Sequence, residues 1–215
     1  MDLQQDGDAL RRWFSANQAR LETAYLAGEQ PWQQSGFGLH GLRPAEQWAT
    51  LRRPVAECVS SSGSFLDIGC ANGYLLECLL TWTARRGLLL TPFGLDFSAK
   101  LVALAHLRLP SYAHQIVVGN AWDWQPAHPF DYVRTELVYV PEELRGEYMT
   151  RLLALFLRPG GKLLVAEYRA RTDSAPALTV DRELRERGFA VERVVCGCWE
   201  GIEQTRVAVV ARALP

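Results

Sequence analysis

The sequence predicts an α/β protein with a doubly wound, mostly parallel seven-stranded sheet and an antiparallel last strand, preceded by an N-terminal helical cap. Three observations support this fold class. Short apolar runs alternate with helical patterns from residue 64 onward. The first apolar run enters a glycine-bearing turn that opens a helix. The last two runs follow one another without a helix between them, which indicates a hairpin and a reversed final strand.

The composition is typical of an ordinary soluble globular domain. The chain has 215 residues, of which 48% are hydrophobic and 22% charged, and its net charge is −1. This balance does not favour binding to nucleic acid or to an anionic membrane surface. We found no apolar run of about twenty residues that would predict a transmembrane helix. The polar, acidic N-terminus and the five irregularly spaced cysteines predict a cytoplasmic protein with reduced thiols.

The first 60 residues are expected to form a cap or substrate lid on the domain made by residues 61–215. Apolar spacing predicts an amphipathic helix over 8–27 and a second helix that opens at Pro44, with Pro54 kinking or ending it. A glycine-rich loop containing His40 joins them. We expect Trp13, Phe14 and Tyr25 to be core residues of the first helix, and the alternative is that this helix acts as a substrate lid. The better candidates for lining a pocket are aromatic residues in or near the loop: Trp32, Phe37 and Trp48.

The remaining chain alternates strands and helices in order. Strands are predicted at 65–68, 92–95, 116–118, 130–137, 163–168, 190–196 and 205–212. Helices are predicted at 74–85, 99–108, 142–157 and 177–187. The Pro-Gly-Gly sequence at 159–161 is expected to end the third of these helices. The pair Cys196 and Cys198 has no second pair of cysteine or histidine ligands at metal-binding spacing, so no metal site is expected.

The most informative stretch runs from Phe65 to Gly73. Its apolar strand carries Asp67 and ends in a turn with small residues at Gly69, Ala71 and Gly73. Glycine provides the unusual dihedral angles of such a turn, and it allows a ligand to approach the backbone without a Cβ in the way. A strand, turn and helix of this kind bring the backbone close to a nucleotide-like ligand.

Polar side chains also end the second and third predicted strands. Asp96 follows Gly73 by roughly twenty positions, the spacing at which a carboxylate meets a ribose diol. The alternative role for Asp96 is a helix cap. Asn120 ends the third strand, and its amide can donate to and accept from an adenine edge. Phe97 or Trp122 offers a face on which a base can stack.

The fourth strand delivers Thr135 and Glu136 at its carboxyl end, the edge at which open α/β sheets bind ligands. Together, in order and spacing, these motifs resemble the class I S-adenosylmethionine-dependent methyltransferases over roughly residues 64–212. Two positions depart from the family pattern: Ala71 stands where the family has its middle glycine, and Asn120 stands where an aspartate is usual. The resemblance implies S-adenosylmethionine as the cofactor and assigns its binding to Asp67, Gly69, Cys70, Ala71, Gly73, Asp96, Phe97, Asn120, Ala121, Trp122 and Thr135.

The implied reaction is transfer of a methyl group from a sulfonium to a nucleophile, for which the protein supplies positioning and desolvation. Glu136 and His40 are the candidates for a general base, which is needed only if the nucleophile must lose a proton. Glu136 could instead form a structural ion pair with Arg134 or Arg169. Because the sequence has no basic patch interleaved with aromatic residues, we expect a small-molecule acceptor rather than a nucleic acid.

Two other functions fit part of this pattern. An NAD(P)-dependent oxidoreductase would share the sheet and the glycine turn, but the sequence lacks Gly-x-Gly-x-x-Gly and its last strand is reversed. A non-catalytic module that binds S-adenosylmethionine would show the same motifs and no turnover. The sequence identifies neither the acceptor nor the oligomeric state.

Overall fold

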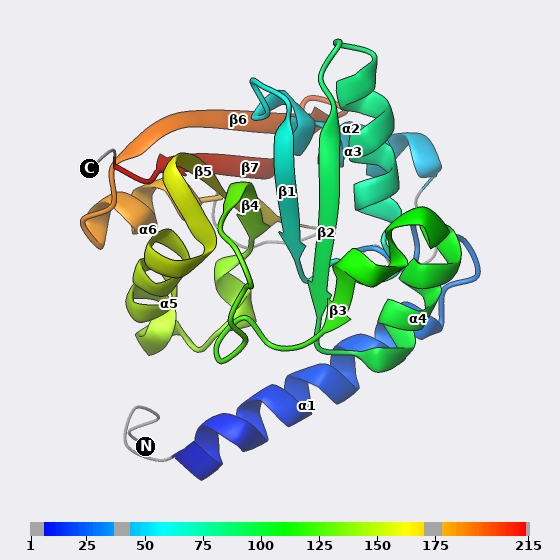
Figure 1. The fold of residues 1–215 in the computed structure, drawn as a ribbon, viewed down its shortest axis with the longest axis horizontal. Coiled ribbons are helices and arrows are strands. Elements are labelled where there is room, and N and C mark those ends of the chain that lie inside the picture. The colour runs from blue at the N-terminus through cyan, green and yellow to red at the C-terminus, as the bar shows by residue number, and fades with distance from the viewer. Residues whose placement is uncertain (1–6, 37–43, 170–177, 214–215) are drawn as a thin grey trace.

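The computed structural model describes residues 7–36, 44–169 and 178–213, and its centre is one seven-stranded sheet (Figure 1). The strands are β1 (Gly63–Ile68), β2 (Leu90–Asp96), β3 (Ile116–Val118), β4 (Phe130–Thr135), β5 (Leu157–Tyr168), β6 (Val191–Trp199) and β7 (Ile202–Ala211). The α-helices are α1 (Gly7–Leu26), α2 (Ala45–Glu57), α3 (Tyr74–Ala84), α4 (Ala99–Arg108), α5 (Arg145–Arg151) and α6 (Val180–Glu186). Shorter helical turns are η1 (Pro110–Gln115), η2 (Leu137–Tyr139), η3 (Glu142–Leu144) and η4 (Leu152–Phe156).

The strand order is β3-β2-β1-β4-β5-β7-β6. Strands β1 to β5 pair in parallel, whereas β7 is antiparallel to both β5 and β6. This topology confirms the predicted fold class, including the reversed last strand. The chain runs from β1 outward to β3 and then returns to place β4 on the other side of β1. Ligands bind open α/β sheets at such a reversal of strand order, outside the carboxyl ends of the strands.

Helices cover both faces of the sheet. One hydrophobic cluster joins α2, α3 and α4 to side chains such as Phe65 and Leu164 on one face. A second joins α5, η4 and α6 to side chains such as Leu66 and Leu163 on the other. Neighbouring residues of one strand belong to different clusters because successive side chains point to opposite faces. The strands therefore read as continuous apolar runs, as buried parallel strands do.

Three local predictions differ from the structure. The helix predicted over 142–157 is divided into η3, α5 and the π-helical turn η4, and β5 already begins at Leu157. Pro-Gly-Gly lies inside β5, where the pairing with β4 shifts register between Phe130 and Tyr132, so the expected stop is a strand bulge. Pro54 does not end α2, which continues to Glu57. In β5, pairing with β4 and β7 therefore outweighs the local sequence signals for a continued helix and for its end.

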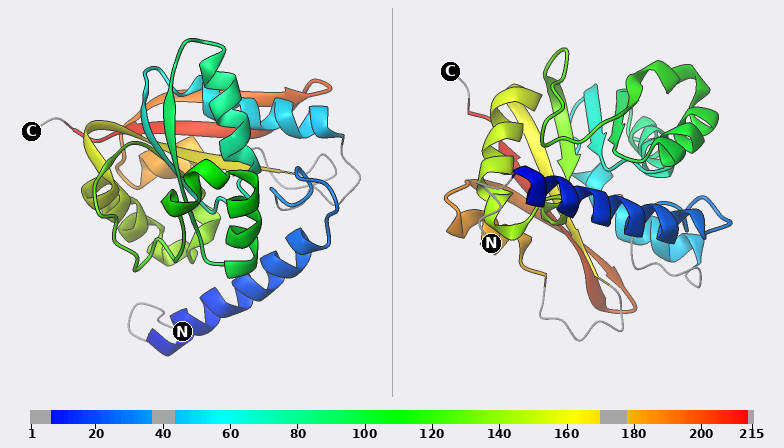
Figure 2. Two further views of the ribbon diagram at one scale, coloured as in Figure 1. Left: turned by 45° about the vertical axis from the view of Figure 1, so that its right-hand side comes forward. Right: turned by 90° about the horizontal axis from the view of Figure 1, so that it is seen from below.

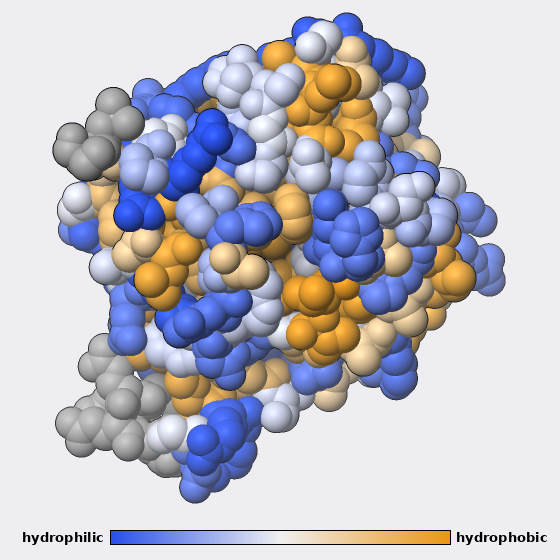
Figure 3. All heavy atoms as spheres, viewed as in Figure 1, coloured by the Kyte–Doolittle hydropathy of each residue, from blue (hydrophilic) through white to orange (hydrophobic). Residues whose placement is uncertain are grey.

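The helix α1 lies across the carboxyl ends of β1 and β2, as Figure 1 and the view from below in Figure 2 show. Ala9 is its only fully buried residue in the described part of the chain. On the face drawn in Figure 3, hydrophobic residues form separate groups among hydrophilic ones. Within the described residues, no helix is both long and apolar enough to cross a membrane. Whether residues 1–60 act as a separate cap or lid stays a prediction.

Candidate functional site

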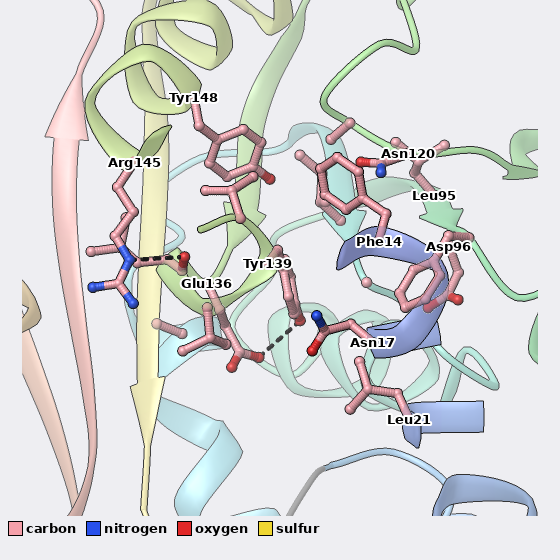
Figure 4. Close-up of a pocket in the computed structure, with 18 of the residues that line it drawn as sticks. Phe14, Asn17, Leu21, Leu95, Asp96, Asn120, Glu136, Tyr139, Arg145 and Tyr148 are labelled. Atoms are coloured by element: carbon pink, nitrogen blue, oxygen red, sulfur yellow. Dashed lines mark hydrogen bonds between the residues drawn. The ribbon is translucent and has the colours of Figure 1, made fainter. Parts of the chain in front are cut away.

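A cavity of about 320 Å³ lies between α1 and the carboxyl ends of the central strands (Figure 4). This volume is within the range of small-molecule binding sites. Its walls come from six parts of the chain: α1, α2, the turns after β1 to β4, α5, the end of β5 and the start of α6. The cavity therefore lies at the sheet edge where the topology predicts ligand binding.

The turn after β1 forms one wall through Gly69. The φ angles of Gly69, Ala71 and Gly73 are +74°, +48° and +75°, all in the left-handed region. Glycine adopts this region without cost, whereas Ala71 is strained by about 1–2 kcal/mol there. The Gly69 amide donates to the Leu95 carbonyl over 2.8 Å, which fixes the turn beside the end of β2. A Cβ on Gly69 would lie 2.5 Å from the hydroxyl of Tyr139, so only glycine fits at this position.

Asp96, at the end of β2, lines the cavity and links two turns. Its Oδ2 accepts from the Ala71 amide and its Oδ1 from the Ser98 amide, each over 2.9 Å. The residue is 5% exposed, and burial raises the pKa of Asp96 to about 6. Each carboxylate oxygen has a further lone pair that can accept a ligand hydroxyl. The Ser98 side chain accepts from the Leu101 amide, so Ser98, not Asp96, is the side-chain cap of α4.

Phe97, Asn120 and Ala121 line the same end of the cavity. The Asn120 side-chain oxygen accepts from the Trp122 amide over 3.0 Å and so holds the turn after β3. Its amide NH₂ keeps its capacity to donate, and Figure 4 shows the Phe14 ring close to the Asn120 side chain. An aromatic ring and a side-chain amide are together suited to a planar, polar-edged group such as a nucleobase.

A buried arginine organises the other end. Arg134 on β4 is in register with Asp67 on β1, and its Nη1 lies 3.3 Å from the Asp67 carboxylate. Arg134 also forms an ion pair with Glu136 and donates to the Tyr139 hydroxyl over 3.0 Å. That hydroxyl in turn donates to Glu136 over 2.9 Å, as drawn in Figure 4. Burial raises the pKa of Asp67 to about 6 against the opposing effect of Arg134.

The helix α1 closes the cavity with Trp13, Phe14, Leu21 and Tyr25. Two polar anchors hold it over the turn after β2. The Gln18 side chain donates to the Phe97 carbonyl over 2.9 Å. Glu22 accepts from the Ser98 hydroxyl over 2.6 Å and pairs with Lys100 over 2.7 Å. The apolar side of α1 thus covers the cavity, and Phe14 also packs against the second hydrophobic cluster.

The cavity brings together six of the predicted site residues: Gly69, Asp96, Phe97, Asn120, Ala121 and Glu136. The others serve nearby elements or lie outside the described residues. Thr135 is fully buried and hydrogen-bonded to Tyr148 over 2.7 Å. His40 lies outside the described residues. A direct contact with ligand stays a prediction for the residues that do not line the cavity, namely Asp67, Cys70, Ala71, Gly73, Trp122 and Thr135.

Two of these have clear packing partners. A Cβ on Gly94 would lie 2.8 Å from the Cys70 sulfur, so the thiol fills the space beside β2, and its burial raises the pKa of Cys70. A Cβ on Gly73 would lie 3.1 Å from that of Ala105, which places Gly73 where α3 approaches α4. The ion pair between Glu136 and Arg134 is the structural alternative that the sequence left open.

The aromatic residues differ in part from the predictions. Trp13, Phe14 and Tyr25 line the cavity, and of these Phe14 also packs against the second hydrophobic cluster, as expected of a core residue. Trp48 is fully buried in the core, although it was a pocket candidate, and Trp32 packs against that same core. Phe37 lies outside the described residues. An amphipathic pattern identifies an apolar stripe but not what covers it.

Sequence reasoning also missed polar residues of the cavity, among them Arg52, Arg145, Glu167 and Tyr168. Arg145 donates to the Leu137 carbonyl and pairs with Glu183 over 3.1 Å. Glu167 accepts from the backbone amides of Thr179 and Val180 at the start of α6. The signal that could have identified Arg52 is its helical spacing, because it lies four residues after Trp48 and three before Val55 and so shares their face of α2, whereas Arg53 does not.

Comparison with solved structures identifies the fold, whereas comparison with sequences does not. No family model matches the sequence, and no curated protein matches it. Among solved structures, the magnesium protoporphyrin IX methyltransferase of Synechocystis, with bound S-adenosylmethionine, is 17% identical with a TM-score of 0.58, and the match covers 96% of each chain. The glycopeptide N-methyltransferase MtfA is 17% identical with a TM-score of 0.61 over 78% of this chain and 96% of its own.

A third neighbour performs a different reaction. The [4+2]-cyclase SpnF is 15% identical with a TM-score of 0.60, and the match covers 92% of this chain and 93% of its own. At these identities the likeness concerns the fold alone. The strand order, the reversed β7 and the neighbours agree: this chain has the class I fold of S-adenosylmethionine-dependent methyltransferases.

Proposed function

We propose that this protein is an S-adenosylmethionine-dependent methyltransferase that acts on a small molecule in the cavity beneath α1. The observation that carries the proposal is the buried carboxylate of Asp96, which lines the cavity between the glycine turn after β1 and the Asn120 turn after β3. A carboxylate for a ribose diol, an exposed glycine backbone and an amide for a base edge are together the donors and acceptors that an adenosine needs.

The residues present fit this cofactor. Asp96 would accept from the ribose hydroxyls, Asn120 would contact the adenine edge, and Phe97 or Phe14 would stack on the base. Gly69 lets a ligand approach the turn, and the end of the cavity beside Arg134 would hold the aminoacyl group. When bound, the cofactor supplies a methyl group activated by a positive sulfonium. The protein's part is to orient the acceptor beside that methyl group and to exclude water, for which α1 is placed.

Glu136 is the described residue that we propose to accept a proton where the acceptor must lose one. Its Oε1 is held by Arg134 and Tyr139, and its side chain is 20% exposed at the cavity wall. Such fixed geometry suits a group that must meet one atom of a substrate. His40 remains the second candidate for this role.

The first test is calorimetric titration with S-adenosylhomocysteine, with NAD⁺ titrated in parallel. The proposal expects micromolar or tighter binding of S-adenosylhomocysteine and no binding of NAD⁺. A preference for NAD⁺ would overturn the proposal in favour of the oxidoreductase alternative.

The likeness to SpnF supports a second candidate, in which the fold and the cofactor site serve a reaction other than methyl transfer. The two are separated by measuring S-adenosylhomocysteine formation from S-adenosylmethionine with a panel of small aromatic and aliphatic acceptors. A methyltransferase forms S-adenosylhomocysteine in step with methylated product. Tight cofactor retention, with substrate conversion and no S-adenosylhomocysteine, would favour the second candidate.

A further inference from the structure

The cavity contains one buried cation with no anion beside it among the described residues. Arg52 projects from α2 into the cavity wall and is only 5% exposed. Its guanidinium lies 3.5 Å from the ring centre of Tyr168 and 5.7 Å from that of Trp48. No carboxylate in the described part of the chain lies within ion-pair distance of Arg52. A buried charge is costly unless it is paired, so this position is suited to an anion that arrives with a ligand.

The acids that share the cavity are already engaged elsewhere. Asp96 accepts from two backbone amides, and Glu136 is held by Arg134 and Tyr139. Glu167 accepts from two amides at the start of α6, and Glu183 pairs with Arg145 and Arg187. None of them neutralises Arg52.

Two further polar groups near Arg52 lack partners. The Tyr168 hydroxyl and the Arg134 Nε are both buried, and neither has a hydrogen-bond partner among the described residues. The Tyr168 ring connects them, because the guanidinium of Arg134 lies 5.5 Å from its centre and that of Arg52 lies 3.5 Å from it. The Arg134 Nε–H, the Tyr168 hydroxyl and the guanidinium of Arg52 have no acceptor or anion beside them in the described part of the chain, which indicates a ligand group rich in acceptor atoms.

The arginine is held in place before any ligand binds. It is packed against the Tyr168 and Trp48 rings, and α2 is anchored to β7 by a 2.7 Å hydrogen bond from the Thr205 hydroxyl to the Leu51 carbonyl. The planar fork of a guanidinium matches the two oxygens of a carboxylate, and its fixed orientation reduces the entropy lost on binding.

We propose that Arg52 is a carboxylate receptor of this cavity, with the Tyr168 hydroxyl as a second donor. The inference rests on the proposed function, because the carboxylate has two sources there: the aminoacyl end of the cofactor, or an acid group on the acceptor. The shared chemistry is a carboxylate at Arg52, and the two sources give different results when Arg52 is replaced.

The test compares wild type, Arg52→Gln and the matched control Arg53→Gln by calorimetry. Arg53 is the next residue on α2, is exposed, and packs its guanidinium 5.0 Å from the Trp82 ring, outside the cavity. The ligands are S-adenosylhomocysteine and 5′-methylthioadenosine, which shares the adenosine and the sulfur but has no carboxylate. Thermal melting of all three proteins establishes that they are folded.

If the cofactor supplies the carboxylate, Arg52→Gln weakens S-adenosylhomocysteine binding about 10- to 100-fold and leaves 5′-methylthioadenosine unchanged. Arg52→Lys, which keeps the charge but loses the fork, recovers part of that loss. Arg53→Gln changes neither affinity. A merely structural Arg52 would weaken both ligands equally, and that result overturns the proposal.

If the acceptor supplies the carboxylate, both nucleosides bind Arg52→Gln normally. Benzoate then binds wild type saturated with S-adenosylhomocysteine, benzamide does not, and Arg52→Gln abolishes benzoate binding. Arg52 is not a carboxylate receptor if the substitution affects neither S-adenosylhomocysteine nor benzoate binding. The proposed function fails separately, if wild type binds neither nucleoside. Benzoate binding to wild type and to Arg52→Gln, without nucleoside, then decides whether Arg52 binds a carboxylate.

Discussion

Replacing Asp96 with asparagine tests the ribose assignment more sharply than removing the side chain. Both carboxylate oxygens accept from backbone amides in the folded protein. An alanine would therefore leave two buried N–H groups unpaired and damage the turns that shape the cavity. Asparagine keeps the size and one acceptor. Its NH₂ group faces one of the two amide donors, which we expect to cost about 1–3 kcal/mol of stability.

The effect on the ligand follows from the charge. Hydrogen bonds to a charged group contribute about 1.5–3 kcal/mol, and the asparagine loses the charge together with one acceptor. We therefore expect Asp96→Asn to weaken S-adenosylhomocysteine binding by about 2–3 kcal/mol, or about 30- to 150-fold. Calorimetric titration measures this directly, beside a thermal melt of the same sample.

Asp131→Asn is the matched control. Asp131 is 8% exposed and accepts from the Ser64 amide and hydroxyl over 2.8 Å. It lies on β4 near the amino end of that strand and does not line the cavity. We expect this substitution to lower stability and to leave S-adenosylhomocysteine affinity unchanged. Equal affinities for wild type and folded Asp96→Asn would refute the ribose assignment.

The remaining predictions concern the turn, the pH dependence and the chemistry. Gly69→Ala adds a left-handed alanine and a Cβ 2.5 Å from Tyr139, so chemical denaturation should show a loss of roughly 2–5 kcal/mol. Gly87 has a similar φ of +73° but open space around it, so Gly87→Ala should lose only the stability that a left-handed alanine costs. Equal losses of stability for the two variants would contradict a steric role for Tyr139. Because the pKa of Asp96 rises from 3.8 unfolded to about 6 folded, the folded state binds more protons between these values and its stability falls as pH rises. Asparagine does not titrate, so the free energy of unfolding of Asp96→Asn should rise relative to that of wild type by up to ~3 kcal/mol from pH 4 to pH 7. A difference in unfolding free energy that stays constant over this pH range would contradict the prediction. Glu136→Gln should lower methyl transfer by about 100-fold and change S-adenosylhomocysteine affinity little, whereas normal acceptor kinetics would leave Glu136 a structural role.

The parts of the site that depend on local sequence could be predicted. A glycine turn after an apolar strand must adopt left-handed angles, and Gly69 and Gly73 do so. Acidic and amide residues at strand ends must lie at one edge of a parallel sheet, and Asp96 and Asn120 line one cavity there. These inferences need only the chain direction and the rule that parallel strands share an edge.

The parts that depend on tertiary packing could not be predicted. The pairing of Asp67 with Arg134 requires the register of β1 against β4, which no local pattern specifies. Helical spacing places Arg52 on the buried face of α2, but that this face borders a cavity depends on how α2 packs on the sheet. The Pro-Gly-Gly sequence indicated a stop, yet strand pairing absorbs it as a bulge in β5. In each case the outcome depends on a long-range contact, and for Pro-Gly-Gly that contact outweighs the local preference.

A crystal structure of the protein with S-adenosylhomocysteine tests the central claim most directly. The account predicts electron density for the ligand in the cavity beneath α1, with the ribose hydroxyls on the Asp96 carboxylate and the adenine beside Asn120. Ligand bound elsewhere on the molecule, or in the cavity with its ribose away from Asp96, would contradict the account.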